Sequence, residues 1–281
     1  MKIKVTTQEE RKRRELLNKQ LKMIEKQEDK MLARKENPLM KKRITPVLDK
    51  IQDKIPEKLK NGLNTAFYRG FVLVFDKGNS YIEKTYQKNK LQLEYDLNNY
   101  AVDQYLTRKR MKNLDKAANQ SKTVNASIAV LEGGVLGFLG IGLPDIPLFL
   151  SVIIRTINEI SLSYGYDYNS EEEKAYILSI ICAAITREDK QRKYDEQTDH
   201  LGTVIDADLV EEIDLKKQMR ETANVLSDAL LTAKFIQGIP FVGVVGGIVN
   251  HTIIRRVSKY AMMKYKKRYL LGKVKEDSHV I

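Results

Sequence analysis

Apolar residues recur every three or four positions along most of the chain, and this spacing predicts amphipathic helices. Thr7 and Glu10 form a capping box that opens the first such segment, and Asn37-Pro38 closes it. One acid, Glu28, interrupts the narrow apolar stripe of this segment, which consists of Leu17, Leu21, Ile24 and Met31. Because the surrounding face is strongly basic, we expect a solvated helical arm. A partner helix and a basic amphipathic helix lying on a membrane are the alternatives.

Later segments repeat the helical spacing and carry their own start and stop signals. Asp145 is typical of an N-cap, and Gly165 stands where a left-handed C-terminal cap is expected. Ser170 and Glu173 form a second capping box, and a last helix is expected from Phe241 to about Leu271. No segment shows the alternation of a strand. The sequence therefore predicts an all-α fold, a single multi-helix bundle with glycine-rich close helix crossings.

Composition and charge divide the chain into parts. Its 281 residues, 42% hydrophobic and 31% charged, are enough to form a globular core. The formal net charge of +12 is concentrated in residues 1–60 and in the last thirty positions. We predict a basic helical arm at residues 1–37, a helical domain at 38–272 and a flexible tail at 273–281.

The basic ends favour a polyanionic partner. Attraction to nucleic acid and attraction to an anionic bilayer are the same screened Coulomb effect, so charge alone does not separate the two. Nucleic acid is disfavoured because the sequence lacks a helix-turn-helix signature and an aromatic platform. We therefore expect an anionic membrane surface as the partner. Deleting residues 1–36 is expected to weaken this binding and to leave the helical core folded.

Two features favour the cytoplasm. The first residues contain no apolar segment of the kind found in secretory signals. The single cysteine, Cys182, forms no disulfide within the chain and is expected to be a small buried hydrophobe. The expected location is cytoplasmic, at the inner face of the membrane.

The stretch Gly133–Phe149 combines five glycines with two prolines and one acid. Its apolar runs are too short for a membrane span, which needs about 17 to 25 mostly apolar residues. Gly133 and Gly137, and likewise Gly243 and Gly247, place small residues one turn apart on a helix face, where a second backbone can approach closely. These glycines are predicted to pack helices in a soluble bundle, and a hairpin inserted in a membrane is the alternative.

Catalytic motifs are absent from the sequence. It has three histidines and neither a zinc-hydrolase motif, a nucleophile elbow nor a phosphate-binding loop, so no cofactor and no metal is predicted. Helix capping is expected to account for the acids Asp206, Asp208, Glu211 and Glu212. The candidate polar cluster consists of Asp145, Arg155, Glu159 and Asn250. Arg155 and Glu159 lie one turn apart on an apolar helix, which indicates a structural ion pair, with a head-group or substrate pocket as the alternative.

The glycine-rich stretch and its continuation, "EGGVLGFLGIGLPDIPLFLSVIIRTINEISLSYGYD", resemble the EcsC family of bacterial proteins, as does the later "IPFVGVVGGIVNHTIIRRVSKYA". The likeness covers most of Ile55–Leu270 and leaves the basic arm as an addition. The family motif is matched at Gly133, Gly137, Asp145, Tyr164, Gly165, Pro240, Gly243 and Asn250. The resemblance implies an α-helical protein linked, in its namesake, to an ABC-transporter operon.

The expected function is that of a non-catalytic, peripheral-membrane accessory protein of the EcsC type. It would support an ABC-transport or envelope process, with a membrane transporter as a further partner. The alternative from another class is a hydrolase or lipid-modifying enzyme that uses Asp145, Arg155 and Glu159.

Overall fold

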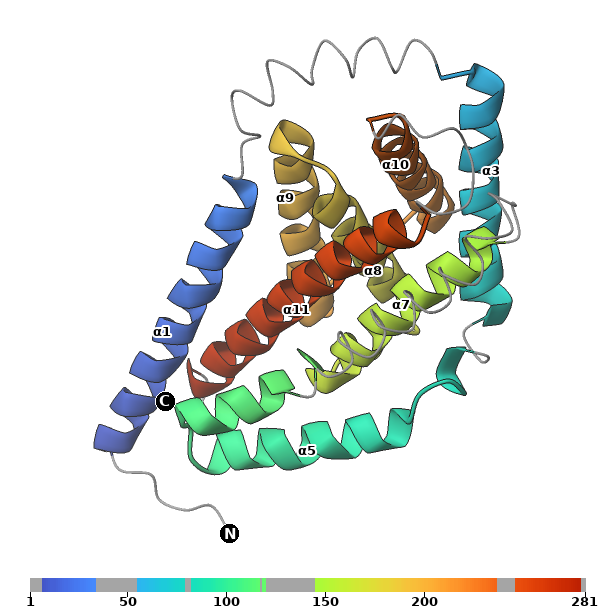
Figure 1. Cartoon of the computed structure of the whole chain (residues 1–281). Coiled ribbons are helices and arrows are strands. Elements are labelled where there is room, and N and C mark those ends of the chain that lie inside the picture. The colour runs from blue at the N-terminus through green and yellow to red at the C-terminus, as the bar shows by residue number, and fades with distance from the viewer. Residues whose placement is uncertain are drawn as a thin grey trace.

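The computed structural model describes residues 7–33, 55–78, 82–116, 118–119, 145–236 and 246–278. Every regular element within these ranges is helical, which confirms the all-α fold (Figure 1). The elements are α1 (Thr7–Leu32), α3 (Glu57–Leu73), the π-helical turn η1 (Val74–Gly78), α5 (Lys88–Gln104), α7 (Asp145–Ser163), α8 (Glu171–Ile185), α9 (Glu188–Asp206), α10 (Leu215–Ile236) and α11 (Gly246–Ser278). Residues 108–116 form a further helix after α5.

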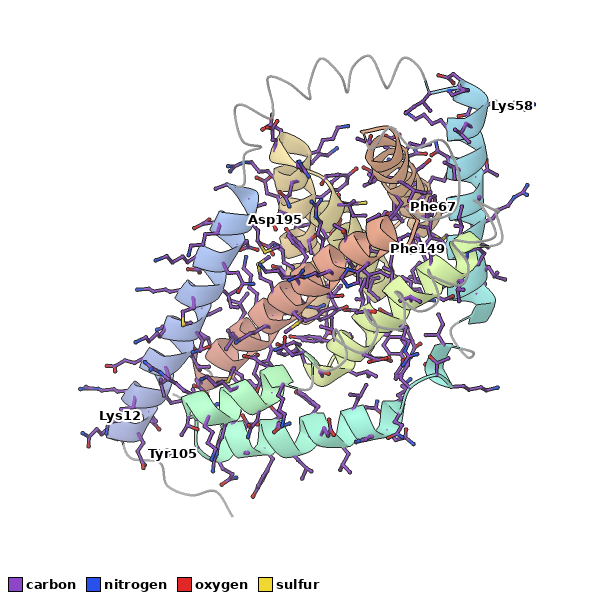
Figure 2. All side chains as sticks on the ribbon, viewed as in Figure 1. Lys12, Lys58, Phe67, Tyr105, Phe149 and Asp195 are labelled. Atoms are coloured by element: carbon purple, nitrogen blue, oxygen red, sulfur yellow. The ribbon has the colours of Figure 1, made fainter. Side chains whose placement is uncertain are left out.

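Helix α8 lies at the centre of the bundle. All of its residues from Ala175 to Ile185 are buried, as expected for a helix that is apolar on every side. It packs against α9, α10 and α11, while α10 packs on α3 and α11 packs on α7. Figure 2 shows Phe67 of α3 beside Phe149 of α7, where the two rings meet edge to face with centroids 6.4 Å apart. One hydrophobic core thus joins helices from both halves of the chain.

Helix α7 is the one helix in the described residues that is long and apolar enough to cross a membrane. The stretch Ile146–Ser163 has a mean hydropathy of 1.4, and 72% of it is buried inside the protein. The core helix of a soluble protein has the same composition, and α7 is covered here by α3, α5 and α11. In this structure α7 is therefore a core helix.

The first helix differs from the solvated arm expected from its charge. Helix α1 packs along α11 and also contacts α9, at the side of the bundle seen in Figure 1. Leu17 is fully buried, Ile24 is 6% exposed, and the acid Glu28 is also buried. The prediction of a solvated arm is wrong because the narrow apolar stripe is covered by the core. Only the opposite face of α1 is left to water.

The ends of several helices also differ from the predicted ends. Helix α11 continues to Ser278, so the expected flexible tail is helical as far as this residue, and Lys273 is buried. The acids expected to cap a helix, Asp206, Asp208, Glu211 and Glu212, all precede α10, which begins only at Leu215. The side chain of Asp214 accepts a hydrogen bond from the Lys217 amide at 2.9 Å and caps α10 in place of the earlier acids.

Two glycines illustrate the packing of the bundle. Gly165 has a φ of +84°, which confirms the predicted left-handed cap, and a Cβ there would overlap the Tyr95 ring. At Gly70 of α3, a Cβ would lie 2.8 Å from Leu150 Cδ1 of α7, so the two helices cross at close range.

The glycines singled out by the sequence lie elsewhere. Gly133, Gly137 and Gly243 fall outside the described residues, and Gly247 lies in α11 where side-chain surroundings are not described. Their role in helix packing stays a prediction.

Candidate functional site

Helix α11 directs a row of cationic side chains into the protein. A buried cation is costly unless it is paired and hydrogen-bonded, so each of these residues requires an acid on a neighbouring element. Contacts of this kind are present for Lys264, Lys266, Lys267, Arg268 and Lys273. The positive charge of these five residues is therefore largely neutralised by acids of the fold.

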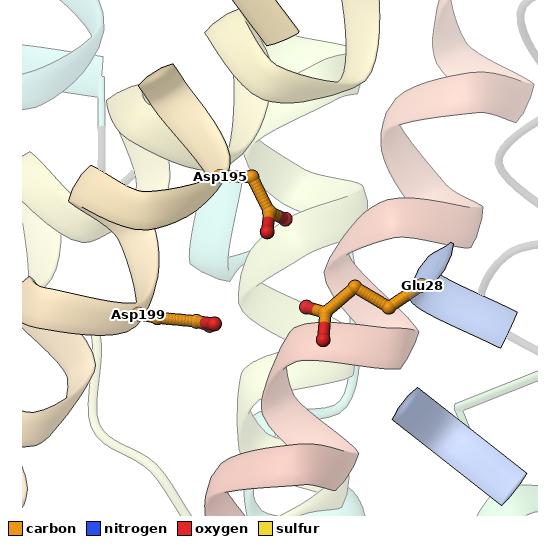
Figure 3. Close-up of side chains that lie close together, drawn as sticks. All are labelled: Glu28, Asp195 and Asp199. Carbon is orange, nitrogen blue, oxygen red and sulfur yellow. The ribbon is translucent and has the colours of Figure 1, made fainter. Parts of the chain in front are cut away.

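The most buried of these contacts surrounds Lys264, whose side chain is fully buried. Its Nζ lies 2.5 Å from Glu28 Oε1, 2.6 Å from Asp195 Oδ1 and 2.6 Å from Asp199 Oδ1. Asp195 and Asp199 are four residues apart and so share one face of α9, while Glu28 comes from α1. Figure 3 shows the three carboxylates converging on one point from these two helices.

Two more residues of α11 complete this cluster, which we call the Lys264 cluster (Glu28, Asp195, Asp199, Tyr260, Lys264 and Lys267). Lys267 Nζ lies 2.6 Å from Glu28 Oε2 and 2.7 Å from Asp199 Oδ2. Burial by itself lowers the pKa of Lys267, but the hydrogen bonds to Asp199 and Glu28 outweigh it and raise the pKa. The Tyr260 hydroxyl donates to Asp195, and burial raises the pKa of this hydroxyl well above its usual range.

The carboxylates of the Lys264 cluster have the geometry of a cation site. Their ligand oxygens all lie within 4.8 Å of one another, as a hard divalent ion would require. The Lys264 ammonium is within hydrogen-bonding distance of all three, so it takes the place that such an ion would occupy. The arrangement joins α1, α9 and α11 through charge and hydrogen bonding.

A second buried ion pair lies one turn further along α11. The Arg268 guanidinium contacts Glu173 at 2.9 Å and Asp206 at 2.6 Å, and it lies between the rings of Tyr166 and Tyr176, 4.2 and 4.4 Å from their centroids. Burial raises the pKa of Glu173, while Arg268 acts in the opposite direction. The Tyr265 hydroxyl donates to the same carboxylate at 2.7 Å.

Glu173 was predicted to close a capping box, and this prediction is half confirmed. The Ser170 hydroxyl accepts a hydrogen bond from the Glu173 amide at 3.1 Å, so Ser170 is the N-cap of α8. The Glu173 side chain contacts Arg268. In a complete capping box the Glu173 carboxylate would contact the backbone amide of the N-cap residue. Here it pairs with Arg268 of α11.

The structure joins two members of the polar cluster predicted from the sequence. Arg155 Nε lies 2.7 Å from Glu159 Oε1, one turn along α7, as the spacing indicated. Asp145 opens α7 and Asn250 lies in α11, but their side chains are outside the described residues. Whether all four residues form one cluster stays a prediction.

Sequence reasoning missed the tyrosines that extend this ion pair into a network. The Arg155 guanidinium lies 6.0 Å from the Tyr86 ring centroid, and the hydroxyls of Tyr86 and Tyr168 are 2.6 Å apart. Tyr168 donates in turn to Glu83 at 2.7 Å, and burial raises the pKa of Tyr86 to about 12. At neutral pH these phenols are therefore hydrogen-bonding groups and not bases.

Cys182 agrees with its sequence interpretation. It is buried in α8, and its thiol donates to the Thr222 hydroxyl at 3.3 Å. Burial raises the pKa of this thiol to about 12, so it stays protonated at neutral pH and is not a nucleophile.

Two of the acids expected to cap a helix, Asp206 and Glu211, contact other side chains. Asp206 pairs with Arg268, and Glu211 Oε2 lies 2.9 Å from His200 Nε2. Helix capping, the expected explanation, is wrong for these two acids because both are used in pairs with other side chains. Two sequence features relate to the Lys264 cluster. The acid Glu28 stands within an apolar stripe, and lysines stand next to apolar positions in α11. Neither feature shows which acid pairs with which lysine.

These contacts define an all-α protein whose long C-terminal helix is tied to its neighbours by buried ion pairs. The chain belongs to the EcsC protein family, since the model of that family matches residues 18–270. The match begins inside α1, so the first helix is largely part of the family region and not an addition to it. A curated relative in Bacillus subtilis (strain 168), the uncharacterized protein YdbA, is 24% identical over 175 residues.

This alignment covers 58% of the chain and 60% of the relative, so the chain spans less than two thirds of the relative's length. No solved structure matches the chain significantly.

Proposed function

We propose that this EcsC family protein is a non-catalytic accessory protein that binds peripherally to an anionic membrane at the cytoplasmic face, in support of a transport or envelope process. The observation that carries the proposal is the cationic surface of the helix at residues 108–116. Its exposed cations are Arg108, Lys109, Lys112 and Lys116. Among the described residues none of the four forms an ion pair, and the one acid of this helix, Asp115, contacts Lys266 at 2.7 Å.

This surface differs from the basic ends that the composition suggested. The buried cations of α11 contact internal acids, and on the outer face of α1 the exposed lysines and arginines are interspersed with exposed acids. A lysine or arginine near an anionic bilayer contributes roughly 1 kcal/mol, so four unpaired cations together suffice for measurable binding. The non-catalytic part of the proposal is supported by the mutual neutralisation of the buried charges, including Arg155 with Glu159.

Co-sedimentation with vesicles tests the proposal. The protein is expected to sediment with phosphatidylcholine vesicles that contain phosphatidylglycerol, to bind these vesicles more weakly at high salt, and to stay in solution with phosphatidylcholine alone. Duplex DNA in the same tube serves as a competing polyanion, and preference for DNA would contradict the proposal.

A charge-matched pair of variants locates the binding surface. Replacing Arg108, Lys109, Lys112 and Lys116 by glutamine is expected to weaken vesicle binding at least tenfold. The control replaces four exposed cations of α1, Arg11, Lys12, Arg14 and Lys19, and removes the same charge. Equal losses in the two variants would show that only net charge matters and that residues 108–116 are not the binding surface.

A further inference from the structure

Helix α5 presents an apolar stripe on each of two sides. On its inner side Val102 is fully buried, and Tyr95 meets Tyr269 edge to face with centroids 6.4 Å apart. On its outer side Leu93, Leu97 and Tyr100 are 58%, 62% and 65% exposed. Steps of four and three residues put these three side chains on one face, away from Val102. Figure 1 shows α5 at the edge of the bundle, where its outer side is open.

Leu93, Leu97 and Tyr100 lie in a row on one helix face, and this arrangement indicates a contact surface. Single exposed leucines are common on soluble proteins, but a row of large apolar side chains on one helix face marks a contact surface. The inner stripe of α5 already provides its attachment to the core, so the fold does not require the outer one. Among the exposed large apolar residues of the described chain, this row is the one that follows the spacing of a helix face.

The charge beside the stripe indicates what covers it. Arg110 donates to the carbonyl oxygens of Ala101 at 2.6 Å and Tyr105 at 2.7 Å, which holds the basic helix 108–116 against the end of α5. Tyr105 is 55% exposed at this junction. Helix α5 has three acids: Asp103 is paired with Lys273 at 2.8 Å, Glu94 is half-buried, and Asp96 is exposed on the flank of the stripe. Leucine and tyrosine next to unpaired cations is the composition of a helix that lies in a membrane interface.

We propose that the outer face of α5 inserts into the interface of an anionic bilayer, with Leu93, Leu97 and Tyr100 at the boundary of head groups and acyl chains. The cations of residues 108–116 contact the phosphates. This inference rests on the proposed function and adds a defined orientation: α5 lies flat on the membrane, and the Lys264 cluster remains inside the protein.

A single tryptophan tests the insertion directly, because the chain contains none. In Leu97→Trp, anionic vesicles are expected to shift the emission to shorter wavelength, and brominated acyl chains are expected to quench it. In the control Val210→Trp, which probes another exposed apolar position, neither change is expected. If the Leu97→Trp protein sediments with vesicles without a shift, the insertion of α5 is refuted while the proposed function stands. If it does not sediment, the proposed function fails.

Two further results would overturn the inference. An emission shift of Leu97→Trp that grows with protein concentration in the absence of vesicles would show that a second copy of the chain covers the stripe. A shift in Val210→Trp and not in Leu97→Trp would place the membrane on another face.

Loss of the stripe gives an independent readout. The triple variant Leu93→Ser, Leu97→Ser and Tyr100→Ser is expected to bind anionic vesicles at high salt at least tenfold more weakly than the wild type. The control variant Leu209→Ser with Val210→Ser is expected to bind as the wild type does. These positions are exposed, so the helical circular dichroism should be retained. Wild-type affinity in the triple variant at high salt would refute the proposal.

Discussion

Glu28 of α1 and Lys264 of α11 are 236 positions apart in sequence, and their charged groups meet at 2.5 Å in the interior of the protein. The contact attaches the first helix to the last and makes the basic N-terminal segment part of the folded domain. Its partners on α9 make the attachment a network and not a single pair. The first predictions concern this network.

Removing the Glu28 carboxylate should destabilise the fold. Breaking a buried ion pair typically costs about 3–5 kcal/mol, but Lys264 keeps Asp195 and Asp199, so Glu28→Ala is expected to lower the free energy of unfolding by about 2 kcal/mol. Urea denaturation followed by circular dichroism measures the change. The control Glu25→Ala, at an exposed position of the same helix, should remain within about 0.5 kcal/mol of the wild type. Equal effects would mean that Glu28 is not paired in solution.

Replacing Lys264 should convert the cluster into a cation site. In Lys264→Met the three carboxylates keep only the Lys267 ammonium, and the excess negative charge favours a bound divalent ion. Calcium is expected to raise the melting temperature of this variant but not that of the wild type. Lys266→Met is the control, because Lys266 pairs with Asp115 outside the cluster. A variant that melts at the same temperature with and without calcium would contradict the geometry.

Deleting α1 should damage the core. The charge pattern alone suggested that residues 1–36 could be removed without affecting the rest, but Leu17 and Ile24 are buried against the bundle and Glu28 is paired. We therefore expect a deletion of residues 1–32 to lower the melting temperature by several degrees and to expose apolar surface that binds a hydrophobic dye. An unchanged melting curve would restore the solvated-arm interpretation.

The close crossing of α3 and α7 can be tested with two glycines of one helix. A side chain at Gly70 meets Leu150, and overpacking typically costs about 1–3 kcal/mol, so Gly70→Leu should lower stability by that amount. Gly62 of α3 has no atom within 4 Å of an added Cβ. Gly62→Leu should be neutral or slightly stabilising, because leucine has the higher helix propensity. Thermal unfolding of the two variants should separate them clearly.

The buried tyrosines should make the protein sensitive to alkali. Burial raises the pKa of Tyr86 from 10.0 to about 12, so between these values the folded chain holds a proton that the unfolded chain has lost. Stability is then complete below pH 10 and falls as the pH rises toward 12. In Tyr86→Phe the slope of stability against pH in this window should decrease by up to about one proton, measured by urea denaturation at several pH values. An unchanged slope would show that Tyr86 is accessible to water.

Local features of this protein were readable from the sequence because they involve residues within about four positions of each other. The helical spacing predicted the all-α fold, the cap at Gly165 and the N-cap at Ser170 followed from their neighbours, and Arg155 with Glu159 share a face of any helix that contains them.

Tertiary structure decided the pairings across the chain. Glu28 could be recognised as an acid within an apolar stripe, but many cations could in principle have faced it, and only the packing of α1 on α11 selects Lys264. In the same way, tertiary packing pairs the Glu173 carboxylate with Arg268 of α11, although the local sequence predicted a capping role for it. The sequence of α5 contains two apolar stripes of similar character, and no local signal distinguishes them. Burial of one stripe against the core leaves Leu93, Leu97 and Tyr100 facing outward, because a helix can bury only the side that its neighbours cover.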